Sequence, residues 1–209
     1  MMRLTDASYT DAAYAAAAVA TVVGAATHRS RLHAVAKPLL MPLLAARSGA
    51  HRQPLLALGL GAATLGDIAM IDPDDDRRFT LGASSFAVMQ GCWSILLYRN
   101  GSRPRRADVV PRVLGWAVGA VVATRRSPTV APVSMAYGIA LGTMSVLGAD
   151  GDTRAVVGST LFTVSDALVL ARRVISDDRA RTALEAVVLT TYIAAQYALV
   201  DSLTVSRRE

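Results

Sequence analysis

Eight apolar segments follow one another along the chain, and short polar stretches separate them. They are Tyr9–Ala26, Leu32–Ala46, Pro54–Ile71, Thr80–Tyr98, Val109–Thr124, Pro128–Leu147, Ala155–Ala171 and Thr182–Leu203. A membrane-spanning helix needs roughly 20 mostly apolar residues, so the shorter segments need tilt or polar flanking residues to span. Open strands leave their backbone groups without partners in lipid. We therefore predict an all-α, polytopic transmembrane helix bundle of about eight spans.

The composition excludes several classes of protein. Of the 209 residues, 53% are hydrophobic and 18% are charged, whereas a soluble domain has about 25% charged residues. Eight spans leave no room for a sizeable soluble domain, so residues 1–209 are expected to form a single transmembrane domain. A net charge of +6 would suggest nucleic acid in a soluble protein. Here the arginines cluster between apolar segments, as in loops at a lipid headgroup surface. The expected partners are membrane lipids and not nucleic acid, and the oligomeric state stays unknown.

The basic loops and one repeated spacing bear on the topology of the bundle. With eight spans both termini share a side, and the basic residues of the two sides are equal in number. The densest basic loop, Arg99–Arg112, lies on the side of the termini, which favours a cytoplasmic position for both ends in a cell membrane. Gly59 precedes Asp67 by the same spacing at which Gly158 precedes Asp166. This pair of spacings would fit a parallel duplication of four plus four spans.

Charged and polar side chains inside the apolar segments are the candidates for function. A charge within a span costs roughly 2.5–3.5 kcal/mol on insertion scales, and Asp67, Asp166 and Lys37 all lie within segments. Polar partners are available in the same segments: Gln90, Tyr137, Tyr192 and Gln196. Three interpretations follow, and the residue types alone leave them open. The carboxylates hold helices together, they line a path for an ion or substrate, or they divide into a general acid and a general base.

Other chemistries have little support in the sequence. His28, His33 and His51 lie in loops or at segment starts, so facing helices would not offer a His-ligated metal site. No Gly-x-Ser-x-Gly motif and no phosphate-binding glycine loop occurs. Cys92 is single and lies in an apolar segment. We expect neither a metal nor a cofactor.

The chain resembles the YhhN/TMEM86 family, whose members include lysoplasmalogenases. The resemblance rests on an ordered set of short motifs across residues 32–203. These are Lys37-Pro38, Gly66-Asp67, Phe79-x2-Gly82-x3-Phe86, Tyr137, Met144, Gly158-x3-Phe162-x2-Ser165-Asp166 and Thr191-Tyr192-x3-Gln196. One position departs from the family pattern, because Gln90 stands where the family usually has a His in the fourth segment. Glutamine cannot shuttle a proton, but it can orient a group by hydrogen bonding.

The resemblance implies a membrane hydrolase that splits the vinyl ether of a lysoplasmalogen into a fatty aldehyde and a glycerophospho-base. Asp67 and Asp166 would then be the catalytic acid and base, in either order. The lipid would be bound by Lys37, Gln90, Tyr137, Tyr192 and Gln196. Two alternatives from other classes predict different behaviour: a small transporter or lipid-translocating protein, and a non-enzymatic membrane protein whose buried Asp residues are structural.

Overall fold

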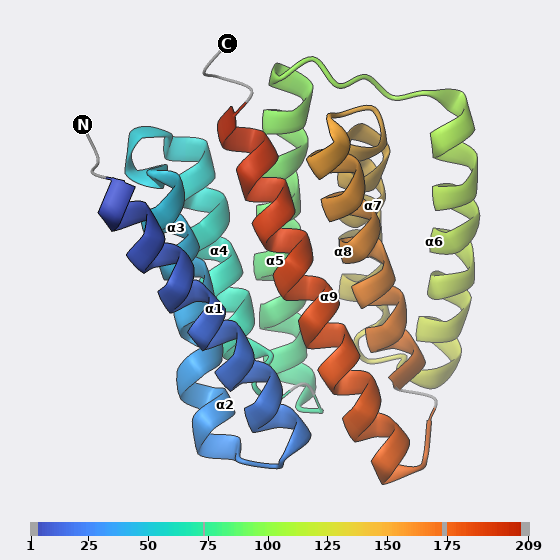
Figure 1. Cartoon of the computed structure of the whole chain (residues 1–209). Helices are drawn as coiled ribbons and strands as arrows, with labels where there is room; N and C mark the ends of the chain where they lie inside the picture. Colours follow the sequence, from blue (N-terminus) through green and yellow to red (C-terminus); the bar gives the residue numbers. More distant parts are fainter. Residues whose placement is uncertain (1–3, 73, 173–174, 206–209) are drawn as a thin grey trace.

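The computed structural model describes residues 4–72, 74–172 and 175–205, and throughout that part all regular structure is helical (Figure 1). The helices are α1 (Leu4–Ala26), α2 (Ser30–Ala36), α3 (Leu40–Ser48), α4 (Pro54–Ala69), α5 (Asp76–Arg99), α6 (Arg106–Arg126), α7 (Ala131–Ala149), α8 (Thr153–Arg172) and α9 (Asp178–Val205), with short 3-10 turns η1 (Lys37–Leu39) and η2 (Ala50–Arg52). The predicted all-α class is confirmed. Five helices, α5 to α9, are long and apolar enough to cross a membrane.

The second predicted segment, Leu32–Ala46, differs most from the expectation of one continuous span. It is divided into α2, the turn η1 and α3. Pro38 and Pro42 explain the division, because a proline has no N–H to donate to the preceding turn and its ring crowds the carbonyl there. Pro38 lies in the first positions of η1, where a missing N–H costs nothing. Lys37 is the first residue of the 3-10 turn between the two helices.

The other segments agree with the helices in position but differ at their ends. α9 begins at Asp178 and α5 at Asp76, each several residues before the apolar run. First turns tolerate acidic residues, because their free N–H groups attract negative charge. At the start of α5, Asp75 accepts hydrogen bonds from the backbone N–H of Arg77 and of Arg78 at 2.8 and 2.9 Å. These bonds lower the pKa of Asp75, and the bond from Arg78 contributes most.

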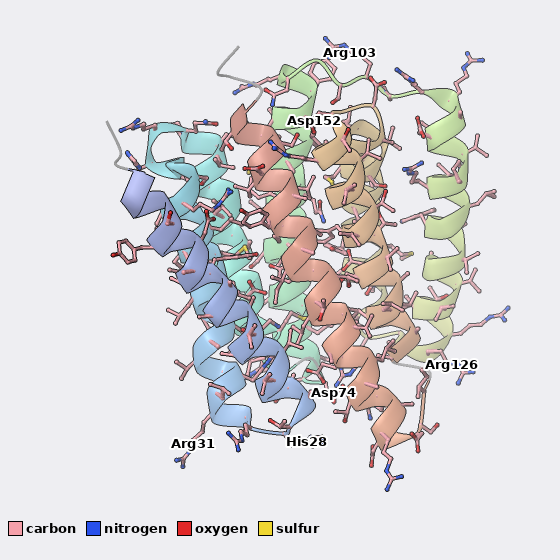
Figure 2. The ribbon with its side chains drawn as sticks, viewed as in Figure 1. His28, Arg31, Asp74, Arg103, Arg126 and Asp152 are labelled. Carbon is pink, nitrogen blue, oxygen red and sulfur yellow. The ribbon has the colours of Figure 1, made fainter. Side chains whose placement is uncertain are left out.

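The helices run up and down the bundle, so Leu4 and Val205 lie at the same end (Figure 1). We call this end the terminal end and the other the opposite end. Charged side chains gather at both: Arg103 and Asp152 at the terminal end, and Arg31, Asp74 and Arg126 at the opposite end (Figure 2). Between the two ends the outer surface is apolar, with large exposed side chains such as Leu65 and Leu81. A surface of this kind suits lipid and not water, so the chain is a multi-pass membrane protein.

The packing of the helices is uneven. α4 packs on α5, and α8 packs on α9, which also contacts α1, α3 and α5. α6 stands at one edge of the bundle, and its main neighbour is α7 (Figure 1). Many of its side chains are exposed, including Val113, Leu114 and Val118. α6 therefore covers one side of the bundle without closing tightly over it.

Two glycines at matching positions of α4 and α8 permit close helix contacts. A Cβ on Gly59 of α4 would lie 2.6 Å from Cζ3 of Trp93 on α5, and a Cβ on Gly158 of α8 would lie 2.8 Å from Cγ of Leu199 on α9. In each case the absence of a side chain lets the next helix in the chain pack closely against the glycine, as is common for small residues in membrane helices. The four-plus-four duplication and the single domain remain predictions.

Candidate functional site

A cavity of about 730 Å³ lies between α4, α5, α6, α7, α8 and α9, and Lys37 of η1 also lines it. Both in-span carboxylates, Asp67 of α4 and Asp166 of α8, are in its wall. Much of the remaining lining is apolar, with Phe86 and Phe162 among the larger side chains. The fold therefore brings two acids from distant parts of the sequence to one apolar space. No hydrogen bond joins them to each other in the part of the chain that is described.

Asp67 is held by a tyrosine from the far end of the chain. Its side chain is 1% exposed, and its Oδ2 accepts a hydrogen bond from the Tyr192 hydroxyl of α9 at 3.0 Å. Its other oxygen, Oδ1, is buried and has no hydrogen-bond partner among the described residues. Lys37 acts on this carboxylate as the nearby opposite charge. Asp67 is thus a fixed carboxylate with one oxygen free to accept a proton or a hydrogen bond.

A chain of hydrogen bonds behind Tyr192 fixes the direction of its hydroxyl proton. Trp93 Nε1 can only donate, and it donates to Gln196 Oε1 at 3.3 Å. The Gln196 amide nitrogen therefore faces Tyr192 and donates to its oxygen at 3.3 Å. The hydroxyl is left to donate to Asp67. Edge-to-face contacts with Phe86 and Phe162, at ring-centroid distances of 5.8 and 5.6 Å, hold the Tyr192 ring in place.

Asp166 also accepts a hydrogen bond from a tyrosine, but from a different one. The Tyr137 hydroxyl of α7 donates to Asp166 Oδ2 at 2.5 Å. Both side chains are only partly buried, because they face the cavity. The neighbouring Ser165 donates to the Val188 carbonyl of α9 at 3.0 Å, which fixes the rotation of α8. Neither Asp166 nor Asp67 forms an ion pair in the described part of the chain, but Asp67 has the Lys37 ammonium as a nearby opposite charge.

Lys37 reaches the cavity from the break in the second span. Its ammonium donates to the Met70 carbonyl at 3.1 Å, just after α4 ends. The side chain is 7% exposed. Interrupted transmembrane helices can bring charged or backbone groups to a binding site in this way. The carbonyl of Met70 is neutral, and no carboxylate of the described residues lies within ion-pair distance of the Lys37 ammonium.

The two glutamines lie behind the cavity and not in its wall. Gln196 is fully buried within the network already described, and it also contacts Met89 Sδ at 2.9 Å. Gln90 is fully buried as well, and neither its amide oxygen nor its nitrogen has a hydrogen-bond partner among the described residues. The amide does interact with the Tyr137 hydroxyl. Of the residues predicted to bind substrate, Lys37, Tyr137 and Tyr192 line the cavity, and Gln196 holds Tyr192 from behind.

Three arginines of the cavity wall, Arg112, Arg126 and Arg172, were not among the residues that the sequence analysis singled out. Arg172 ends α8, where it looked like a headgroup-facing loop residue, yet it lines the cavity and its side chain is 16% exposed. Arg112 was counted with the polar loop, but it lies inside α6 and its Nε donates to Ser145 Oγ at 3.1 Å. Their position inside or directly at the end of an apolar run was the sequence feature that could have identified them. Among the described residues, no three His, Cys, Asp or Glu side chains gather as metal ligands.

The comparison with family models decides the family. The model of the YhhN family matches residues 32–203, which is most of the chain. This chain belongs to the YhhN family. Searches of curated proteins and of solved structures each gave no match. The matched region begins just after α2 starts and contains every residue of the cavity wall.

The motifs that carried the resemblance to this family surround the cavity. Phe79 and Phe86 of α5, Phe162 of α8 and Tyr192 of α9 all line it. Gly66 and Gly82 permit close packing beside it, because an added Cβ would lie 2.9 Å from the Phe86 ring and 2.7 Å from Met70 Cγ, respectively. Motifs that are scattered in the sequence of this YhhN-family chain thus converge on one space.

Proposed function

We propose that this protein hydrolyses the vinyl ether bond of a lysoplasmalogen, giving a fatty aldehyde and a glycerophospho-base, by acid and base catalysis at Asp67 and Asp166. The observation that carries the proposal is that both carboxylates line one largely apolar cavity that opens among membrane helices. The family resemblance supports the reaction class. The free Oδ1 of Asp67 and the nearby Lys37 support the catalytic use of that carboxylate.

The hard step in this reaction is protonation of carbon. We assign the carboxylate role to Asp67, because the positive charge of Lys37 is nearby, and the donor role to Asp166. Asp166 gives its proton to the outer carbon of the double bond, and the π electrons form the new C–H bond. The carbon next to oxygen becomes part of an oxocarbenium ion. A fixed carboxylate stabilises such a cation well in a site that excludes bulk water.

Water then completes the reaction. Asp67 takes a proton from water as the water oxygen bonds to the cationic carbon, which gives a hemiacetal. The bond from that carbon to the glycerol oxygen breaks, and the glycerol oxygen takes the proton from Asp67. The hemiacetal hydroxyl proton returns to Asp166 as the aldehyde forms. Both carboxyl groups are restored, and one water is consumed.

The polar residues around the two acids act by positioning. Tyr192 and Tyr137 each donate to one carboxylate oxygen, which leaves the other oxygen for chemistry. Gln196 holds Tyr192, and Gln90 lies beside Tyr137. In this scheme no proton passes through residue 90, so a glutamine there is compatible with activity.

Turnover in heavy water tests the protonation of carbon directly. We expect the aldehyde released in D₂O to carry one deuterium on carbon 2, because the proton from the carboxylic acid exchanges with solvent before each turnover. Mass spectrometry of the aldehyde, trapped as an oxime, measures this. A sample of unlabelled aldehyde incubated with the protein in D₂O controls for later exchange. Aldehyde without deuterium would exclude the mechanism, and no aldehyde from well-folded protein would exclude the function.

The proposed setting is the cell membrane, with both ends of the described chain on the cytoplasmic side. Arg103, in the densest basic loop, lies at the terminal end (Figure 2), and basic loops favour the cytoplasm. With Cys92→Ser as background, we expect a membrane-impermeant maleimide to label Arg179→Cys and not Arg106→Cys in intact spheroplasts. Both should react once the membrane is opened. The reverse pattern in intact spheroplasts would place the termini outside.

A further inference from the structure

The cavity has different electrostatics at its two ends. Towards the terminal end, Arg112 is satisfied by its own surroundings, with Asp108 Oδ1 at 3.3 Å and Ser145 Oγ at 3.1 Å. Towards the opposite end, Lys37, Arg126 and Arg172 all line the wall. The cations at the opposite end are therefore the ones available to a ligand.

Arg172 carries a buried, unpartnered nitrogen, and its ion pairs are long. Its Nε is buried and has no hydrogen-bond partner among the described residues. Its Nη2 lies 3.7 Å from Glu185 Oε2 and 3.9 Å from Asp74 Oδ2, both longer than a hydrogen bond. Lys37 and Arg172 both line this end of the cavity. Two cations on one wall, one of them with a buried nitrogen that lacks a partner among the described residues, favour an anionic ligand there.

The carboxylates near this end do not cancel the positive charge. Lys37, Arg126 and Arg172 face Asp67 and Glu185, while Asp166 is protonated in the proposed reaction. A phosphodiester is a single anion with several acceptor oxygens, and arginine binds such a group well. Glu185 and Asp74, which also approach Arg172, suit the positive amine of a zwitterionic headgroup.

Beyond the charged end the cavity continues as an apolar slot between α6 and α8. Pro111, Gly115 and Gly119 line it at successive turns of α6. A Cβ on Gly115 would meet nothing within 4 Å, and one on Gly119 would first meet Leu170 of α8 at 3.7 Å. Small residues on a membrane helix usually allow a neighbouring helix to approach. Here they face open space, because α6 packs mainly on α7.

We propose that the cavity holds one single-chain phospholipid in its leaflet orientation, with the phosphate between Lys37 and Arg172 and the chain in the slot between α6 and α8. The headgroup then lies at the opposite end of the bundle, at the level of Arg126 and Asp74 (Figure 2). The first glycerol carbon falls between the phosphate and the chain, beside the carboxylates. The inference rests on the proposed function for the bond that is cleaved and for the protonated state of Asp166. The lipid enters sideways from the bilayer past α6.

Binding of an uncleavable lipid tests the proposal without turnover. A saturated 1-O-alkyl lysophosphocholine lacks the double bond that must be protonated, and the matching 1-O-alkylglycerol lacks the phosphate as well. Native mass spectrometry of the full chain released from detergent counts the bound lipid over a titration. We expect one alkyl lysophosphocholine per chain, bound about tenfold more tightly than the alkylglycerol, the scale of a charge-assisted contact.

Two pairs of variants separate the headgroup site from the chain site. Arg172→Gln should remove the preference for the phosphate-bearing lipid, whereas Arg181→Gln, which removes a charge near Asp74 outside the cavity wall, should keep it. Gly115→Leu should fill the slot and lower the affinity for both lipids by about tenfold. Gly61→Leu is its control, since a Cβ there also meets nothing within 4 Å but Gly61 does not line the cavity.

The outcomes distinguish this inference from the proposed function. Equal affinity for the two lipids in the wild type, or an unchanged preference in well-folded Arg172→Gln, would overturn the phosphate site. Unchanged binding in Gly115→Leu would overturn the slot. If the lipid binds as expected but a lysoplasmalogen yields no aldehyde, the binding inference stands and the hydrolase function falls. Circular dichroism and gel filtration establish that each variant is folded.

Discussion

Asp67→Asn and Asp166→Asn should each abolish aldehyde release from a lysoplasmalogen while the helical bundle stays folded. Asparagine has nearly the same shape as aspartate but cannot give or take the proton. Acid or base catalysis by one positioned group is worth about 10²–10⁴-fold in rate, so the loss should reach the background of the assay. The fold should survive, because Tyr192 and Tyr137 can donate to an amide oxygen as they donate to the carboxylates.

The matched control is a carboxylate in the same bundle but away from the cavity. Asp201 of α9 pairs with Arg47 at 3.2 Å and with Arg154 at 3.0 Å, and it does not line the cavity. Asp201→Asn should keep its turnover per folded molecule. Aldehyde release is measured on purified protein, with the folded fraction taken from gel filtration. Normal turnover in both Asp67→Asn and Asp166→Asn would exclude the two-carboxylate mechanism, and a loss of stability alone would favour a structural role for these residues.

The fold was predictable from the sequence because lipid imposes a simple rule. A span must be apolar and must satisfy its own backbone, so each apolar run becomes a helix. The rule says little about where helices end, since polar first turns such as the one at Asp76 extend beyond the apolar run. It also missed the break at Lys37, where two prolines divide one apolar run into separate helices.

The candidate site was predictable in its acids but not in its shape. Asp67 and Asp166 stand out because a charge within a span is costly. Their sharing of one cavity depends on how each helix is rotated, and that is decided by contacts such as the one between Ser165 and Val188. Arg172 is a residue of the cavity wall that the sequence alone could not identify. At the end of an apolar run an arginine suits the headgroup region, and only the packing of α8 against α9 places it at a cavity.

Any larger side chain at Gly158 should disturb the contact between α8 and α9. A Cβ there would lie 2.8 Å from Leu199 Cγ, 2.9 Å from the Leu199 backbone nitrogen and 3.0 Å from the Ala195 carbonyl oxygen. Two of these atoms belong to a helix backbone, which cannot turn aside as a side chain can. Gly158→Ala should therefore lower the free energy of unfolding by about 1–3 kcal/mol, the usual cost of overpacking.

Gly61→Ala should instead raise the free energy of unfolding. A Cβ on Gly61 meets nothing within 4 Å, so alanine there gains helix propensity, worth roughly 0.5–1 kcal/mol, without a clash. Unfolding in mixed micelles with increasing sodium dodecyl sulfate, followed by circular dichroism, measures both variants. Equal stability of the two variants would show that α8 and α9 are not in close contact at this point. Because Asp166 lies on α8, two turns beyond Gly158, a helix forced away from α9 would also move this carboxylate within the cavity, and Gly158→Ala should lose turnover as well as stability.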